Sequence, residues 1–151
     1  MVKSNLESVL IIGVGLIGSS IARALKKNDL AKNIYGLDKN LECLTKCKKL
    51  KILTKGESLI NKFHKQFDLI IICSPLSTYK SIFLELNSFV TQDTLITDVG
   101  STKVSVINDF NESVTNQHLL FVPSHPIAGL EKSGPEFGFA KLFHNRFCII
   151  T

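Results

Sequence analysis

The chain of 151 residues is 44% hydrophobic and 21% charged, which is the composition of a globular protein and excludes a disordered one. No apolar run approaches the roughly 20 residues of a membrane helix, so we expect no membrane partner. The formal net charge is +5, but 16 of the 18 basic residues are Lys and the chain has no Trp. Since no stripe of aromatic and Arg residues is present to stack bases, we also expect no nucleic-acid partner.

The four cysteines show neither a CxxC pair nor a zinc-like spacing, so we expect free thiols and no metal. The first residues, M-V-K-S-N-L-E-S, lead directly into an apolar run, which argues against a signal peptide and for a cytoplasmic protein. The Lys-rich stretch 26–65 is expected to be the solvated side of two helices, the alternative being that it attracts anionic ligands.

Apolar runs alternate with segments of helical period along the whole chain. The expected elements are, in chain order, a strand at Val9–Ile12, a helix at Leu16–Lys27, a strand at Ile34–Leu37, a helix at Leu41–Leu50, a short strand near Ile52–Leu53, a short helix after Gly56, a strand at Phe67–Cys73, a helix at Leu76–Phe89, a strand at Thr94–Asp98, a helix from about Lys103 to Phe110, and strands at Leu119–Val122 and Arg146–Ile150. This order predicts an α/β fold, a Rossmann-type doubly wound and mostly parallel sheet, with residues 1–151 as one domain.

The glycines that follow the first expected strand form the pattern GxGxxG, placed between a strand and a helix. In a dinucleotide site Gly13 permits the tight turn, Gly15 lets a pyrophosphate approach the backbone, and Gly18 lets the helix pack closely on the strand. The alternative is a glycine turn in some other α/β protein.

The helix that starts at Leu16 and Ile17 has unpaired N–H groups at which the pyrophosphate is expected to bind. Asp38 ends the second expected strand, twenty residues after Gly18. Its carboxylate is suited to the ribose hydroxyls and repels a 2′-phosphate, so the sequence predicts NAD rather than NADP as the cofactor.

Polar residues follow the other strands too, and in a parallel sheet all of these exits lie at one edge. We therefore expect five clusters to converge on one crevice: Gly13–Gly18, Asp38, Cys73-Ser74-Pro75, Asp98–Lys103 and Ser124-His125-Pro126. Within them Cys73, Ser74, Pro75, Asp98 and Gly100 are expected to contact the cofactor.

His125 is the candidate proton acceptor, because an imidazole at the nicotinamide end of the crevice can take the proton of an alcohol as hydride leaves the carbon. Ser101 or Thr102 is either only a helix N-cap, or Ser101 also hydrogen-bonds His125 or the nicotinamide ribose. Lys103 is expected to be solvated or to face the ligand. Glu131 and Lys132 either bind a polar substrate or pair with each other.

At these residues the sequence resembles the prephenate/arogenate dehydrogenase family of tyrosine biosynthesis. The matching pieces are I-I-G-V-G-L-I-G-S-S-I-A, G-L-D, I-I-I-C-S-P, I-T-D-V-G-S-T-K and S-H-P-I-A-G-L-E-K-S-G-P, which occur in the family's order. The resemblance implies NAD-dependent oxidation of prephenate with loss of CO2, giving 4-hydroxyphenylpyruvate. It also implies that His125 and Ser101 are catalytic and that Glu131 is a polar group of the active site.

The chain departs from the family at two points. Leu130 stands where the family pattern has Thr, which leaves the choice between prephenate and arogenate open. Members continue into a helical domain that forms a homodimer and supplies an arginine to the substrate, so we expect the 151-residue chain to bind NAD but to turn over prephenate poorly alone. The alternatives are another NAD-dependent reductase, a non-catalytic NAD-binding module or, more remotely, a methyltransferase.

Overall fold

The computed structural model describes residues 6–151, and its main sheet has six parallel strands in the order β3-β2-β1-β4-β5-β6. The strands are β1 (Leu6–Ile12), β2 (Ala31–Leu37), β3 (Lys55–Glu57), β4 (Leu69–Ile72), β5 (Thr94–Asp98) and β6 (Leu119–Val122). The order reverses between β1 and β4, which confirms the predicted Rossmann-type α/β fold.

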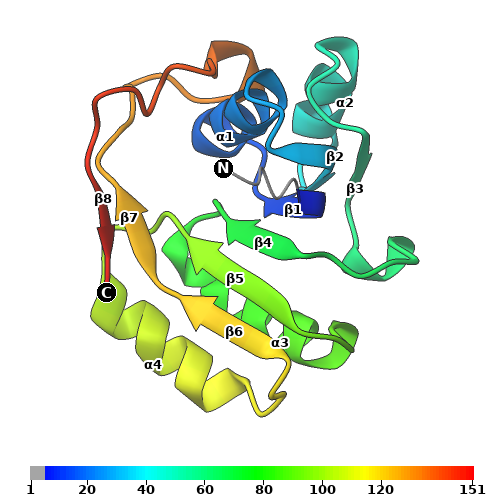
Figure 1. Cartoon of the computed structure of the whole chain (residues 1–151), viewed down its shortest axis with the longest axis vertical. Coiled ribbons are helices and arrows are strands. Elements are labelled where there is room, and N and C mark those ends of the chain that lie inside the picture. The colour runs from blue at the N-terminus through cyan, green and yellow to red at the C-terminus, as the bar shows by residue number, and fades with distance from the viewer. Residues whose placement is uncertain (1–5) are drawn as a thin grey trace.

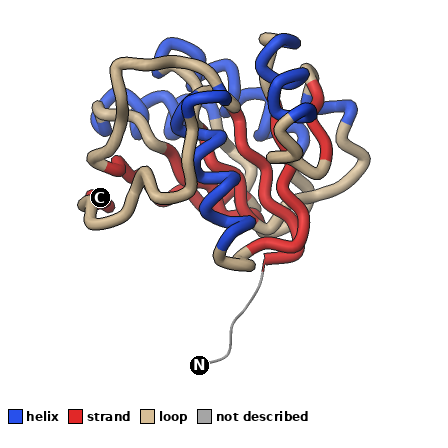
Figure 2. Tube along the Cα trace, turned by 90° about the horizontal axis from the view of Figure 1, so that it is seen from above, coloured by secondary structure: helices blue, strands red, loops and turns tan. Residues whose placement is uncertain are grey.

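Four helices cover the two faces of this sheet (Figures 1 and 2). They are α1 (Leu16–Lys27), α2 (Leu41–Lys49), α3 (Tyr79–Phe89) and α4 (Lys103–Ser113). Side chains of successive residues in a strand point to opposite faces of the sheet. The apolar run of β1 therefore contributes to the hydrophobic core on each face. Val9 and Ile11 join the core beneath α1 and α2, whereas Leu10 and Ile12 join the core beneath α3 and α4.

Three short 3₁₀ turns complete the helical elements: η1 (Ile60–Lys62), η2 (Leu76–Thr78) and η3 (Pro135–Phe137). The first is the short helix predicted after Gly56, and the second is the start of the helix predicted from Leu76, which continues as α3. The predicted strand at Ile52–Leu53 is wrong. Ile52 lies in the turn that follows α2, where its N–H bonds to the Cys47 carbonyl of that helix, and the strand β3 begins three residues later.

The final predicted strand exists, but it lies outside the main sheet. β8 (Cys148–Ile150) pairs antiparallel with β7 (Ser124–Pro126), a strand that the sequence analysis did not predict. The two form a separate ribbon beside the end of β5 (Figure 1). As a result His125 lies within a strand of its own rather than in the loop after β6.

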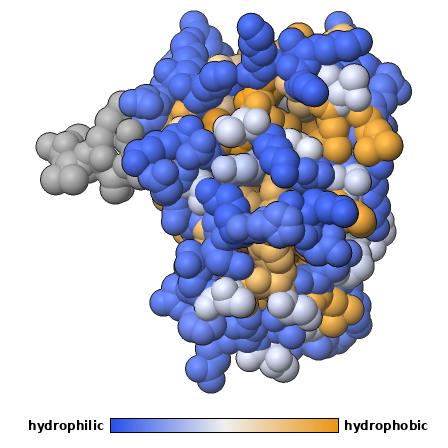
Figure 3. Space-filling view, turned by 90° about the vertical axis from the view of Figure 1, so that its right-hand side faces the viewer, coloured by the Kyte–Doolittle hydropathy of each residue, from blue (hydrophilic) through white to orange (hydrophobic). Residues whose placement is uncertain are grey.

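The outer face around α2 and β3 is largely hydrophilic, with apolar patches between the charged side chains (Figure 3). Most lysines of the 26–65 stretch are exposed, as predicted for a solvated helical surface. None of the helices in residues 6–151 combines the length and apolar character needed to cross a bilayer. The expectation about a signal peptide concerns the first residues, of which 1–5 lie outside the described part of the chain.

Candidate functional site

The turn after β1 requires glycine at two positions for steric reasons. Gly13 has a φ of +90°, and a Cβ there would lie 2.7 Å from the Cys73 carbonyl carbon and from the Ser74 nitrogen. A Cβ on Gly18 would overlap the Gly13 carbonyl oxygen and approach the Ile11 side chain. The predicted roles of these glycines, a tight turn and close packing of helix on strand, are therefore confirmed.

Gly15 is different, because a Cβ at this position would meet no protein atom within 4 Å. Gly15 is the N-cap of α1, it supplies no side-chain cap, and the first turn holds no acidic residue. The positive end of this twelve-residue helix therefore has no side-chain cap and no acidic side chain, and the space beside Gly15 is open. This arrangement fits an anionic group of a ligand that approaches the backbone at Gly15.

Asp38 ties the end of β2 to this glycine loop. One carboxylate oxygen accepts a hydrogen bond from the Val14 N–H at 2.9 Å, and the other accepts from the Asn40 N–H at 2.8 Å. The side chain is half-buried, and an ionised carboxylate can accept up to about four hydrogen bonds, so it still has sites for ligand hydroxyls. Asp38 therefore orders the loop and presents negative charge to the cleft.

A cleft of about 300 Å³ opens at the carboxyl ends of β1, β2 and β4. Six residues predicted for the cofactor line it: Gly13, Gly15, Asp38, Cys73, Ser74 and Pro75. Its remaining wall includes Ser58, Leu59 and Ile82, which the sequence analysis did not assign to a site. Leu59 and Ile82 read as ordinary apolar positions of helical segments, so only the fold shows that they border the cleft.

Cys73 forms part of the cleft wall, and its thiol is not a reactive group. Desolvation, with the nearby Asp98 carboxylate as a smaller cause, raises the pKa of its thiol well above the ordinary value, so the side chain stays neutral.

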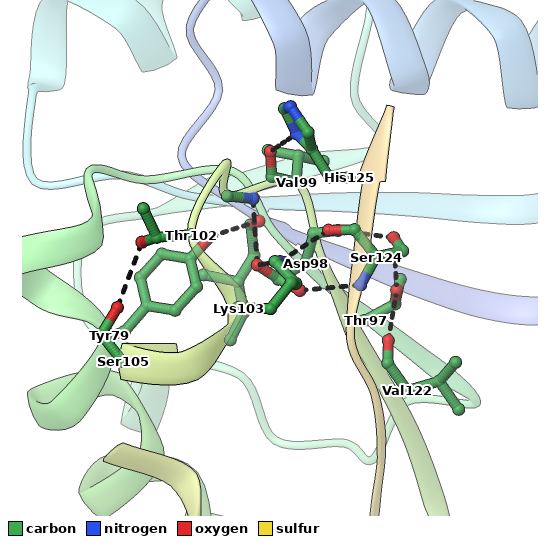
Figure 4. A network of polar contacts seen from close by, with 12 residues as sticks. Tyr79, Thr97, Asp98, Val99, Thr102, Lys103, Ser105, Val122, Ser124 and His125 are labelled. Carbon is green, nitrogen blue, oxygen red and sulfur yellow. Dashed lines mark hydrogen bonds and ion pairs between the residues drawn. The ribbon is translucent and has the colours of Figure 1, made fainter. Parts of the chain in front are cut away.

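The residues after β5 and β6 form a second cluster, which is buried (Figure 4). Asp98 has no exposed surface, and its carboxylate accepts from the Gly100 N–H at 2.9 Å, the Ser124 N–H at 3.0 Å and the Lys103 ammonium at 2.5 Å. Lys103, whose side chain is 14% exposed, also donates to the Ser124 carbonyl oxygen at 2.7 Å. Lys103 is therefore not solvated, which was one of its two predicted alternatives, while a cofactor contact of Asp98 and a ligand contact of Lys103 stay predictions.

This buried cluster binds both the N–H and the carbonyl of Ser124, the residue directly before His125. Nδ1 of His125 lies 3.1 Å from the Val99 carbonyl oxygen, and the ring points away from the buried carboxylate (Figure 4). A carbonyl oxygen only accepts, so Nδ1 must carry the hydrogen. In the neutral imidazole this tautomer leaves the lone pair on Nε2, which is the atom able to take a proton.

Ser101 does not bond to His125 in the structure, and its contact with the nicotinamide ribose stays a prediction. It is exposed, and the hydrogen bonds within residues 6–151 include none between Ser101 and His125. Thr102, one of the two predicted N-cap residues, is the N-cap of α4, and its side chain makes no cap hydrogen bond. The Val99 carbonyl holds the imidazole instead, a backbone group that no residue-type pattern could have pointed out.

Glu131 and Lys132 lie exposed in the segment that follows β7. They form no ion pair with each other in the described part of the chain; the Lys132 ammonium lies 5.1 Å from the centre of the Phe137 ring. Their role in substrate binding stays a prediction.

Residues 21–151 match the family model of the prephenate dehydrogenase nucleotide-binding domain. The chain belongs to the prephenate dehydrogenase family. It is 38% identical over 147 residues to prephenate dehydrogenase of Bacillus subtilis, covering 96% of this chain and 39% of the relative. It is 35% identical over 147 residues to cyclohexadienyl dehydrogenase of Zymomonas mobilis, covering 96% of this chain and 49% of the relative.

Among solved structures, the chain resembles Aquifex aeolicus prephenate dehydrogenase in complex with hydroxyphenyl propionate and NAD+. The TM-score is 0.88 at 34% identity, and the match covers 96% of this chain and 50% of that one. The chain thus spans half or less of the length of these members of the prephenate dehydrogenase family. The family resemblance inferred from the sequence motifs is confirmed.

Proposed function

We propose that the chain is the NAD-binding part of an enzyme that oxidises and decarboxylates prephenate to 4-hydroxyphenylpyruvate. The single observation that carries the proposal is the open approach at Gly15, beside the uncapped start of α1 and the Asp38 carboxylate. The similar Aquifex aeolicus enzyme was solved with NAD+, which supports the choice of cofactor.

Different residues bind different parts of the dinucleotide. The N–H groups at the start of α1, with Leu16 and Ile17, hold the pyrophosphate. Asp38 accepts hydrogen bonds from the adenosine ribose and repels a 2′-phosphate. Leu59 and Ile82 offer apolar surface to the adenine in the cleft beyond Asp38.

Bound NAD supplies the hydride acceptor for the reaction. His125 takes the proton of the substrate hydroxyl on Nε2, because Nδ1 is held as a donor by the Val99 carbonyl. Loss of hydride turns the hydroxyl into a carbonyl, and loss of CO2 then makes the ring aromatic and leaves the bonding electrons on that oxygen, to which His125 returns the proton. The protein therefore needs chiefly to align the substrate and to hold one proton between the two steps. The direct role of Ser101, a location in the cytoplasm and the expected homodimer belong to this proposal as well.

Isothermal calorimetry on the 151-residue chain tests the cofactor assignment. NAD is expected to bind, and NADP to bind at least about tenfold more weakly because of the Asp38 carboxylate. Equal or tighter binding of NADP, or no binding of either dinucleotide, would overturn the assignment.

The reaction is tested with the polypeptide of the complete reading frame, offered prephenate and arogenate in turn with NAD, by the absorbance of the reduced cofactor. His125→Asn keeps a polar side chain with an N–H donor but removes the proton acceptor, and it is expected to lower kcat by about 10²–10⁴-fold with little change in NAD affinity. Unchanged kcat in this variant would exclude His125 as the proton acceptor. Turnover of arogenate but not of prephenate would show that arogenate, and not prephenate, is the substrate.

A further inference from the structure

The segment between β7 and β8, residues 127–147 and called the strap below, reaches from His125 back to the first two helices. At its base the Ile127 N–H bonds to the Phe147 carbonyl oxygen at 2.8 Å, which extends the pairing of β7 with β8. At its far end η3 packs against α1 and α2, at the top of Figure 1. The strap therefore joins the strand that carries the proton acceptor to the helix that begins at the glycine loop.

Two buried serines of α1 bind the far end of the strap. The Ser19 hydroxyl lies 3.3 Å from the Pro135 carbonyl oxygen, and the Ser20 hydroxyl accepts from the Phe139 N–H at 3.1 Å. Both serines have no exposed surface. Gly138 lies so close to α1 that a Cβ there would overlap the Ser19 hydroxyl and lie 2.7 Å from the Arg23 guanidinium.

An ion pair closes the contact with α2. The Lys46 ammonium lies 2.7 Å from a Glu136 carboxylate oxygen and 3.0 Å from Glu42, one turn earlier in the same helix. The hydrogen bond and charge of Lys46 lower the pKa of Glu136, so the pair is ionised at neutral pH. Between the two anchored ends, residues 129–133 are exposed and include Glu131.

We propose that Glu136 and Gly138 are positioning residues, which tie the strap to α1 and α2 and thereby fix His125 and the span 129–133 relative to the nucleotide loop. The three residues of β8 are all exposed, and β8 pairs with β7, the strand that carries His125. Release of the far end loosens the partner strand of His125 and, with it, the bond from Nδ1 to the Val99 carbonyl. The inference deepens the proposed function, on which it rests for the role of His125.

The 151-residue chain offers a matched pair of variants for the test. Glu136→Gln removes the carboxylate that joins the strap to Lys46, whereas Glu42→Gln removes the carboxylate that joins Lys46 to its own helix. Both changes cost one negative charge beside the same ammonium group, and only the first touches the strap. Lys46→Arg retains the charge and is expected to behave as the parent chain.

Amide hydrogen exchange is followed by mass spectrometry in the free chain. Glu136→Gln is expected to raise exchange in residues 127–134 by about two- to fivefold, the range of an exposed ion pair, while Glu42→Gln leaves it unchanged. The ring ¹⁵N chemical shifts of His125 provide a second measurement. They would stay unchanged if the contact of Glu136 stabilised the strap without positioning His125. In the parent Nδ1 should show the protonated shift, and in Glu136→Gln both ring nitrogens should move towards averaged values.

Equal exchange in the two glutamine variants, or unchanged His125 nitrogens in Glu136→Gln, would overturn the positioning role. Gly138→Ala should produce the larger effect, because the overlap with Ser19 displaces the strap itself. These readouts need no cofactor. A chain that fails to bind NAD contradicts the proposed function, whereas a chain that binds NAD but shows no strap response contradicts only this inference.

Discussion

Substitution of Asp98 by Asn should destabilise the chain far more than a change of one atom suggests. The carboxylate has no exposed surface and accepts three hydrogen bonds, one of them from the Lys103 ammonium. An amide of the same shape turns one acceptor into a donor, which then faces an N–H group whichever way it is oriented. It also leaves the ammonium without a counter-charge in a site that is almost closed to water.

Breaking a buried pair from one side costs about 3–5 kcal/mol, against a total of about 5–15 kcal/mol for a domain. Urea unfolding followed by far-UV circular dichroism measures the loss, since the chain has no Trp. Lys103→Met breaks the same pair from the other side and should also destabilise the chain, because it leaves the buried Asp98 carboxylate with two backbone N–H donors but no counter-charge. A loss below about 1 kcal/mol in Asp98→Asn would refute the view that this carboxylate organises the turn.

Three further outcomes follow from the geometry. Gly15→Ala should fold normally but bind NAD at least about tenfold more weakly in calorimetry. Gly13→Ala forces a side chain into a positive-φ turn, and its free energy of unfolding in urea should fall by about 1–3 kcal/mol. Asp38→Asn should reduce the preference for NAD over NADP by about tenfold, and an unchanged ratio of dissociation constants would contradict the repulsion argument. Burial raises the pKa of Cys47 from 9.0 to about 11, so a thiol reagent at pH 8 should label exposed Cys148 but spare Cys47, and early labelling of Cys47 would contradict its burial. Because folding favours its protonated form, stability from Cys47 is complete below about pH 9 and is lost as the pH rises towards 11, which unfolding midpoints across this range will check.

The glycine loop could be predicted from the sequence because its constraints are local. Gly13 and Gly18 are required by atoms within the same strand–turn–helix unit or the neighbouring strand, and the spacing to Asp38 reports that unit directly. The central strands β1 and β4 were also evident, since a strand buried on both faces is a continuous apolar run, whereas the exposed edge strand β3 has no such run and was misplaced.

The surroundings of His125 could not be predicted in the same way. An acid at the end of a strand, such as Asp98, has the pattern of a ligand contact; its inward role depends on Ser124, 26 residues later in the chain. β7 has only three residues and ends in Pro126, so no periodicity reveals it. Its partner β8 is antiparallel, and that pairing is decided by the course of the strap rather than by local pattern.

The division of the core into two layers has a consequence for optical experiments. The chain has two Tyr residues and no Trp, and both Tyr35 and Tyr79 pack into the layer beneath α3 and α4. Tyr35 contacts Phe63 and Phe67 edge to face in that layer. Intrinsic fluorescence therefore reports on one side of the sheet, while the layer beneath α1 and α2, which supports the glycine loop, contains no chromophore of this kind. If the two layers melt separately, the emission signal will miss the loss of the nucleotide-binding side.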